Sequence, residues 1–175
     1  MFIILYHATT QIKGEYILRE RLFRKDVKRY YSEESGSNGP TTQGFVYFTN
    51  EITFSLYFAN CHNLSENNSN IYIFKINIPR RFLEADEDEI ELQSPKNEHQ
   101  YANRLEWSLA ELKSCRIASD INIDSFPTKI YRCIGININE ILPLLRNVGY
   151  NYKYVTSNYT PQQKNFIDSI IWEKA

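Results

Sequence analysis

This sequence has little of what several specialised protein classes require. Its 175 residues include three Cys, three His, one Met, six Gly and six Pro. The low Gly and Pro content excludes collagen-like and low-complexity chains. Lys+Arg total 20 and Asp+Glu total 21, so the formal net charge is −1 and no global attraction to nucleic acid or acidic lipid is expected. No hydrophobic run approaches the roughly 18 residues that a membrane span needs.

Cysteine and histidine are too scattered for the usual stabilising or metal-binding frameworks. The three cysteines are odd in number, far apart and free of any Cys-x-x-Cys pair: Cys61, Cys115 and Cys133. This spacing argues against a disulfide framework and against a structural zinc site. The histidines are equally dispersed, so we expect no metal centre: His7, His62 and His99. The short apolar start lacks the basic region of a signal peptide, and we expect a cytoplasmic protein without membrane contact.

Aromatic residues are what the sequence has in excess. It contains 13 Tyr, 10 Phe and 2 Trp, which together make 14% of the chain, and 42% of all residues are hydrophobic. Such a composition is that of a globular protein and excludes disorder. Because a chain of this length usually forms one domain, we expect a single domain over residues 1–175.

The expected elements alternate irregularly between strands and helices. Apolar and β-branched runs predict strands over 2–7, 45–48, 71–78, 116–123 and 129–138. Helical spacing of apolar residues predicts helices over 11–22, 50–60, 98–112, 139–146 and 161–172, with Asn50 as an N-cap. We expect polar loops over 32–43 and 61–70, and a solvated loop or edge over the acidic run 84–91. This order favours an α+β fold.

Two polar side chains stand near the end of the first predicted strand. His7 and Thr9 are two positions apart, and residues at that spacing in an extended chain face the same side. Both can therefore contact one ligand. The alternative is structural: a histidine satisfied at a strand end and a threonine that begins a turn.

A pair of tyrosines forms the second candidate feature. Tyr47 closes the strand over 45–48, and Tyr57 lies ten residues later near the end of the following helix. Two opposed phenol rings would form a flat slot for a planar heteroaromatic group such as nicotinamide. The alternative is core packing, which we expect for the neighbouring phenylalanines: Phe45, Phe48, Phe54 and Phe58.

Charged residues supply two further candidates. Glu106 and Glu111 on the helix over 98–112 are possible catalytic carboxylates, although glutamates on such helices usually face solvent. A basic patch is interleaved with Phe23, Tyr30 and Tyr31 and is made of Arg19, Arg21, Arg24, Lys25, Lys28 and Arg29. Cations with aromatic rings suit a nucleic-acid backbone and stacked bases. A solvated helix face is the alternative.

Taken together, these segments resemble the ADP-ribosyltransferase superfamily, in the His-Tyr-Glu branch shared by diphtheria-type toxins and poly(ADP-ribose) polymerases. The resemblance covers residues 1–140 in order. Residues 6–9, Tyr-His-Ala-Thr, are similar to that branch's first-strand His-x-Ser/Thr motif, and 17–22 to the helix after it, except that Arg21 stands where Gly is common. Residues 44–49 with Ala59 are similar to the stretch that supplies the tyrosines, and 71–79 to the next strand.

The sequence departs from the family pattern at the catalytic glutamate. Residues 129–136 are similar to the late strand of the polymerases, but Pro127 and Thr128 stand where a Glu would precede it. The resemblance then leaves Glu106 as the preferred catalytic residue and Glu111 as the second choice. If neither carboxylate reaches the pocket, the resemblance implies a catalytically inactive member of the fold.

The resemblance implies a fold, a substrate and a reaction. The fold would be a single-domain split β-sandwich with peripheral helices, and NAD would be the co-substrate. Catalysis would involve His7 and Tyr47 beside the glutamate, and NAD would contact His7, Ala8, Thr9, Tyr47, Phe48 and Tyr57. The activity would be mono-ADP-ribosylation of a nucleic acid or protein by a toxin or defence effector, with a possible antitoxin partner. NAD glycohydrolysis and a non-catalytic binding module are the alternatives.

Overall fold

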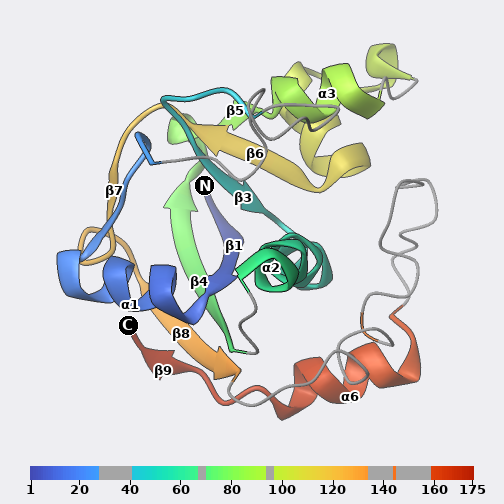
Figure 1. Ribbon diagram of the computed structural model, residues 1–175. Helices are drawn as coiled ribbons and strands as arrows, with labels where there is room; N and C mark the ends of the chain where they lie inside the picture. The colour runs from blue at the N-terminus through green and yellow to red at the C-terminus, as the bar shows by residue number, and fades with distance from the viewer. Residues whose placement is uncertain (28–40, 67–69, 94–96, 134–143, 145–158) are drawn as a thin grey trace.

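The computed structural model describes residues 1–27, 41–66, 70–93, 97–133, 144 and 159–175 (Figure 1). For residues 60–66 the description covers the backbone alone. The strands are β1 Phe2–Thr10, β2 Leu22–Phe23, β3 Val46–Thr49, β4 Ile71–Pro79, β5 Glu84–Ala85, β6 Ser114–Ile117, β7 Ile121–Asn122, β8 Thr128–Cys133 and β9 Glu173–Lys174. The α-helices are α1 Gln11–Glu20, α2 Ile52–Glu66, α3 Glu87–Gln93, α4 Arg104–Trp107 and α6 Pro161–Ser169. The shorter helices are η2 Arg80–Phe82, η3 Glu98–Gln100 and the π-helical η4 Ser108–Leu112.

Seven of the strands form one sheet in the order β5-β6-β3-β1-β4-β8-β9, and every neighbouring pair runs antiparallel. A separate two-stranded sheet joins β2 and β7. Helices and antiparallel strands are mixed along the chain, which confirms the α+β class.

The seven-stranded sheet consists of two parts with very different ladders. In what we call the long half-sheet (β1, β4, β8 and β9), β1 and β4 face each other over nine residue pairs, from Phe2↔Pro79 to Thr10↔Ile71. The short half-sheet (β3, β5 and β6) has four facing pairs between β3 and β6. The two parts meet in the registered pair Tyr6↔Thr49 between β1 and β3. Figure 1 shows the short half-sheet beside α3 and the long half-sheet running toward β9.

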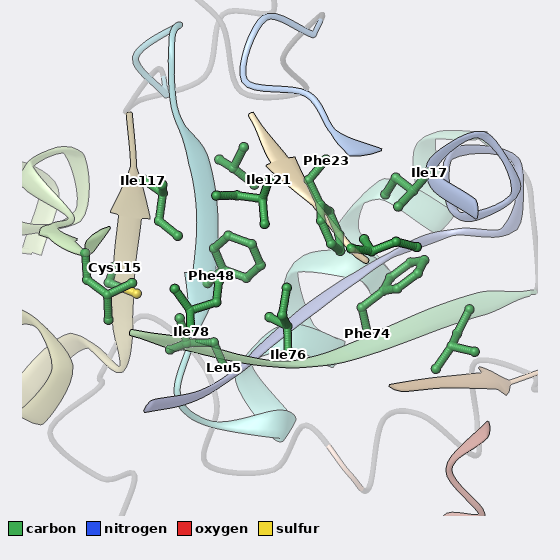
Figure 2. Packing of buried hydrophobic residues seen from close by; sticks show 14 of the residues in the cluster. Leu5, Ile17, Phe23, Phe48, Phe74, Ile76, Ile78, Cys115, Ile117 and Ile121 are labelled. Atoms are coloured by element: carbon green, nitrogen blue, oxygen red, sulfur yellow. The ribbon is translucent and has the colours of Figure 1, made fainter. Parts of the chain in front are cut away.

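Successive side chains of β1 point to opposite faces of the sheet, and a hydrophobic cluster lies on each face. Leu5 belongs to the first cluster, which also includes Ile17 of α1, Phe23 and Ile121 of the two-stranded sheet, and buried residues of both half-sheets: Val46, Phe48, Tyr72, Phe74, Ile76, Ile78, Cys115, Ile117 and Ile130. Figure 2 shows part of this cluster, with side chains from β1, β3, β4 and β6 packed together. Ala8 belongs to the second cluster, with Ile52, Leu56 and Ala59 of α2 and with Ile71, Ile73, Cys133 and Leu144.

The residue directly after α1 has a backbone conformation that is unusual for a residue with a side chain. α1 ends with Arg21 in the left-handed conformation, at φ 57° and ψ 29°, and its backbone N–H donates to the carbonyl of Ile17. This is the conformation for which glycine is the least strained residue.

On the inner side of α1, a Cβ on Gly14 would lie 2.5 Å from Cδ2 of Tyr72, so the helix approaches β4 too closely for any side chain there.

Several sequence predictions are confirmed in type but differ in extent. The first strand runs on to Thr10, and the strand over 71–78 is present as β4. The final helix begins at Pro161, with Thr160 and Gln163 forming a capping box, and it ends at Ser169. The predicted strand over 116–123 is split into β6 and β7. The predicted helix over 98–112 is interrupted at 101–103, between η3 and α4.

Three predictions are wrong. Residues 61–66 continue α2 instead of starting a loop. The acidic run 84–91 is not a solvated loop: it forms the edge strand β5, which agrees with the edge alternative, and the first part of α3, and Asp86 is 3% exposed. Asn50 makes no N-cap bond, because α2 begins at Ile52 and Oδ1 of Asn50 has no hydrogen-bond partner among the described residues, while its Nδ2 donates to the carbonyl of Leu109 at 3.0 Å. The predictions for 32–40, 134–138, most of 139–146 and the tyrosine-rich 150–158 lie outside the described residues.

Candidate functional site at the junction of the half-sheets

The point where β1 separates from β3 carries the first predicted site residue. His7 follows Tyr6, the residue that pairs with Thr49, and its Nδ1 lies 2.9 Å from the carbonyl oxygen of Tyr47. A carbonyl oxygen only accepts, so Nδ1 carries the proton in this hydrogen bond, and in the neutral ring Nε2 is the acceptor. The imidazole thus adds a side-chain hydrogen bond to the backbone pairing that joins the two half-sheets.

His7 also packs against aromatic rings of the first cluster. Its ring centroid lies 5.2 Å from Phe23 and 5.7 Å from Phe48, both in edge-on arrangements. Thr9 lies on the same face of β1, as predicted, and is 5% exposed. Ala8 lies on the opposite face in the second cluster. The structure therefore brings His7 together with the backbone of Tyr47 and with the ring of Phe48.

The two predicted slot tyrosines have different neighbours. The Tyr47 hydroxyl hydrogen-bonds to the carboxylate of Asp88 and lies 2.9 Å from the carbonyl oxygen of Thr42. Burial first, and then the bond to Asp88, raise the pKa of Tyr47 far above its ordinary value. Tyr57 lies on α2, packs against the second cluster, and has its ring 5.5 Å from that of Phe58. A nicotinamide slot between Tyr47 and Tyr57 stays a prediction.

The two predicted catalytic glutamates lie on the segment from α4 to η4. Glu106 pairs with Arg80, whose Nη2 is 2.8 Å from Oε1. Glu111 accepts a hydrogen bond from the hydroxyl of Tyr101. Neither carboxylate hydrogen-bonds or ion-pairs with His7 or Tyr47 in the part of the chain that the structure describes.

Two carboxylates that sequence reasoning did not single out lie closer to the junction. Glu51, immediately before α2, accepts a hydrogen bond from the hydroxyl of Tyr159. Its charge adds to burial in raising the pKa of Tyr6, the residue before His7. Asp88, in the second position of α3, bonds directly to Tyr47. The only sequence signal was that Glu51 follows the end of β3, whereas nothing local distinguished Asp88 within the acidic run.

A buried polar network fixes α3 beside the short half-sheet. Oδ1 of Asp86 accepts from the backbone N–H of Glu89 at 3.2 Å, which caps the start of the helix. Ser108 Oγ accepts from the backbone N–H of Asp86 at 3.1 Å and donates to the carbonyl of Ser114 at 2.8 Å. Burial raises the pKa of Asp86 to about 6. These contacts determine where Asp88 lies.

The basic patch is partly neutralised where the structure describes it. Arg21 pairs with Asp124, and Arg24 pairs with Glu20 at 3.1 Å. Arg19 lies 3.5 Å from the same Glu20 and stacks over the ring of Tyr16 at 4.9 Å. The backbone N–H of Lys25 donates to Asp120, while Lys28 and Arg29 lie outside the described residues. The paired arginines fit a solvated surface at least as well as a nucleic-acid contact.

The described residues contain neither a metal-binding cluster nor a membrane-spanning helix. No group of three or more His, Cys, Asp and Glu side chains within them is arranged to hold a metal ion. None of the helices in the described ranges combines the length and the apolar character that crossing a bilayer requires. No protein-family model matches the sequence, and comparison with curated proteins finds no match.

Proposed function

We propose that this protein binds NAD at the junction of the two half-sheets and transfers its ADP-ribose group. The observation that supports the proposal is the meeting of His7 and Tyr47 at the point where β1 leaves β3. In the resemblance drawn from the sequence these two residues belong to separate motifs, 40 positions apart in the chain. Their contact is what a shared site requires.

The residues at the junction have chemistry that suits a dinucleotide. In the neutral ring, Nε2 of His7 accepts a hydrogen bond, which fits a ribose hydroxyl. The ring of Tyr47 is partly exposed and offers a flat face, which fits nicotinamide. The basic residues of 19–25 are largely paired, so they do not by themselves favour a nucleic-acid acceptor over a protein or water.

The proposed reaction exchanges one bond at the nicotinamide ribose. The bond from C1′ to the nicotinamide nitrogen breaks, and its electron pair leaves with neutral nicotinamide. A nucleophilic oxygen or nitrogen of the acceptor bonds to C1′ and releases its proton to a carboxylate or to solvent. A nearby carboxylate would stabilise the positive charge that develops on the ribose in the transition state. The candidates for this carboxylate are Glu106 and Glu111, which the resemblance selects, and Glu51, whose charge helps to raise the pKa of Tyr6 beside His7.

Labelled NAD distinguishes the possible acceptors. The purified protein is incubated with NAD labelled in the adenylate part, together with cell extract, nucleic acid or buffer alone. We expect label in macromolecules and release of nicotinamide; free ADP-ribose alone would indicate glycohydrolysis. Growth arrest on expression, abolished by the same change that abolishes turnover, would support a toxin or defence effector with an antitoxin partner.

Conservative variants assign the carboxylate. Glu106→Gln, Glu111→Gln and Glu51→Gln are compared for turnover and for NAD binding. A carboxylate that acts mainly in the transition state should lose turnover far more than NAD binding when it becomes an amide, by about 100-fold or more. If all three variants retain full turnover, the assignment of these carboxylates is wrong.

A non-catalytic binding module is the second candidate function. It is favoured by one observation: the two glutamates that the resemblance selects are engaged with Arg80 and Tyr101 instead of His7 or Tyr47. Binding of NAD without release of nicotinamide would support this function. Absence of both binding and turnover would overturn the NAD proposal itself.

A further inference from the structure

The acidic run contributes a half-buried carboxylate to the proposed site. Asp88 stands in the second position of α3, and its side chain is 17% exposed. Its neighbour Glu84 is 51% exposed. A carboxylate that is partly withdrawn from water needs hydrogen-bond or ion-pair partners for its oxygens.

Both oxygens of Asp88 are used. Oδ2 accepts from the backbone N–H of Thr42 at 2.8 Å and from the hydroxyl of Tyr47. Oδ1 accepts from Oγ1 of Thr42 at 2.6 Å and lies 3.5 Å from Nη1 of Arg116. The carboxylate therefore joins three separate parts of the chain: the segment before β3, β3 itself and β6.

Arg116 completes the surroundings of the Tyr47 ring. It faces Tyr47 across the β3–β6 ladder, and side chains at facing positions lie on the same side of the sheet. Its guanidinium carbon lies 4.0 Å from the centroid of the Phe45 ring, and its side chain is 13% exposed. Phe45 in turn lies edge-on to Tyr47, with centroids 6.4 Å apart. The Tyr47 ring thus has fixed neighbours at its side and at its hydroxyl.

We propose that Asp88 is a positioning residue that holds the Tyr47 ring by its hydroxyl and so presents the ring for stacking against the nicotinamide of NAD. That the stacking ligand is NAD rests on the proposed function. A tyrosine held at its backbone and at its hydroxyl cannot change its χ1 rotamer without breaking the hydrogen bond to the half-buried Asp88 carboxylate. A ligand that stacks on it then binds without the cost of ordering the ring.

A double-mutant cycle on NAD turnover tests the proposal. The four proteins are the wild type, Asp88→Asn, Tyr47→Phe and the double variant, with Glu91→Gln on the same helix as the control. Ordering one side chain is worth roughly 0.5–1.5 kcal/mol, so we expect Asp88→Asn to raise KM for NAD roughly two- to tenfold with a smaller change in kcat. Tyr47→Phe keeps the ring but removes its hydroxyl, and should raise KM similarly. The double variant should be no worse than either single variant.

The midpoint of urea unfolding provides a readout that does not depend on NAD. If Asp88 acts through the Tyr47 hydroxyl, the fall in midpoint caused by Asp88→Asn should shrink in the Tyr47→Phe background, and Glu91→Gln should change little. Additive midpoints, or an equal rise of KM in both backgrounds, would overturn the proposal. If the wild type binds no NAD while the midpoints are coupled, the proposed function fails but the hold of Asp88 on Tyr47 stands.

Discussion

The long and short half-sheets are stabilised in different ways. The ladder of the long half-sheet carries buried residues at the four successive positions 71–74, of which Ile71, Ile73 and Phe74 are 0% exposed. The short half-sheet shares the first cluster but also contains a buried polar network around Asp86, with Ser108 fully buried. The candidate site lies where these two parts meet, at Tyr6↔Thr49.

This difference separates a scaffold from the part that adjusts a site. Hydrophobic burial is non-directional and tolerates small shifts, whereas hydrogen bonds fix both distance and angle. The polar network therefore suits the placing of a side chain such as Tyr47, while the long ladder contributes buried apolar area. Substitutions in each half-sheet should therefore differ in the size of their effect on stability.

Phe74→Ala should be the most destabilising of these changes. Phe74 is 0% exposed and its ring lies 5.1 Å from that of Phe23, so truncation removes buried area and leaves a cavity. We expect the free energy of unfolding to fall by about 3–5 kcal/mol, measured by urea denaturation. Phe2→Ala on the neighbouring strand is the matched control, because Phe2 is 57% exposed and its truncation should cost about 0.5 kcal/mol or less. Equal losses for the two variants would contradict a scaffold role for the long half-sheet.

Asp86→Asn should change how stability depends on pH. Burial raises the pKa of Asp86 to about 6 from its usual 3.8, so between these values the folded protein binds more protons than the unfolded chain. Its contribution to the free energy of unfolding is therefore largest below about pH 4 and is lost as pH rises past 6, by roughly 3 kcal/mol in total.

The comparison with the variant isolates this carboxyl from the others. The guanidinium of Arg104 holds the pKa of Glu87 below its usual range, and Arg21 does the same for Asp124, so both groups act in the opposite direction. We therefore expect the wild type to lose stability relative to Asp86→Asn between pH 4 and 7, as measured by urea unfolding at each pH. Asparagine can still accept the bond from Glu89, so the helix cap persists. Parallel pH profiles of the two proteins would show that Asp86 has an ordinary pKa.

Lys113→Gly should give a small gain. Lys113 lies between η4 and β6 in the left-handed conformation, at φ 59°, which disfavours any residue with a Cβ. Its backbone carbonyl accepts from Asn50 at 3.0 Å, and glycine keeps that bond. We expect an increase of about 0.5–1 kcal/mol in the free energy of unfolding, seen as a higher urea midpoint. Lys113→Ala removes the same side chain without relieving the strain, and a gain of equal size there would contradict this explanation.

Local patterns were sufficient for the regular parts of the fold. The β-branched and aromatic run over 71–78 predicted β4, because strands buried on both faces read as continuous apolar sequence. Pro161 after Thr160 predicted the start of α6. Arg21 stands where glycine is common in the families that the sequence resembles, and its left-handed φ of 57° is the conformation that favours glycine at that position.

The candidate site was only partly accessible to such patterns. The shared face of His7 and Thr9 follows from strand geometry alone, but the 2.9 Å contact of His7 with Tyr47 depends on a pairing across 40 residues. The acidic run was predicted as a solvated loop because charged residues usually are exposed. Its burial depends on Thr42, Ser108 and Arg116, none of which is close to it in sequence.

The α+β class, most strands and helices, and the choice of His7 and Tyr47 as candidates follow from local sequence patterns. Those features rest on side-chain periodicity and backbone preference, which act over a few residues. Long-range contacts instead pair β1 with β3 in one registered position, bond Glu106 and Glu111 to Arg80 and Tyr101, and bond Asp88 to Tyr47. Each of these depends on which buried polar groups find partners far along the chain, and no local pattern encodes that choice.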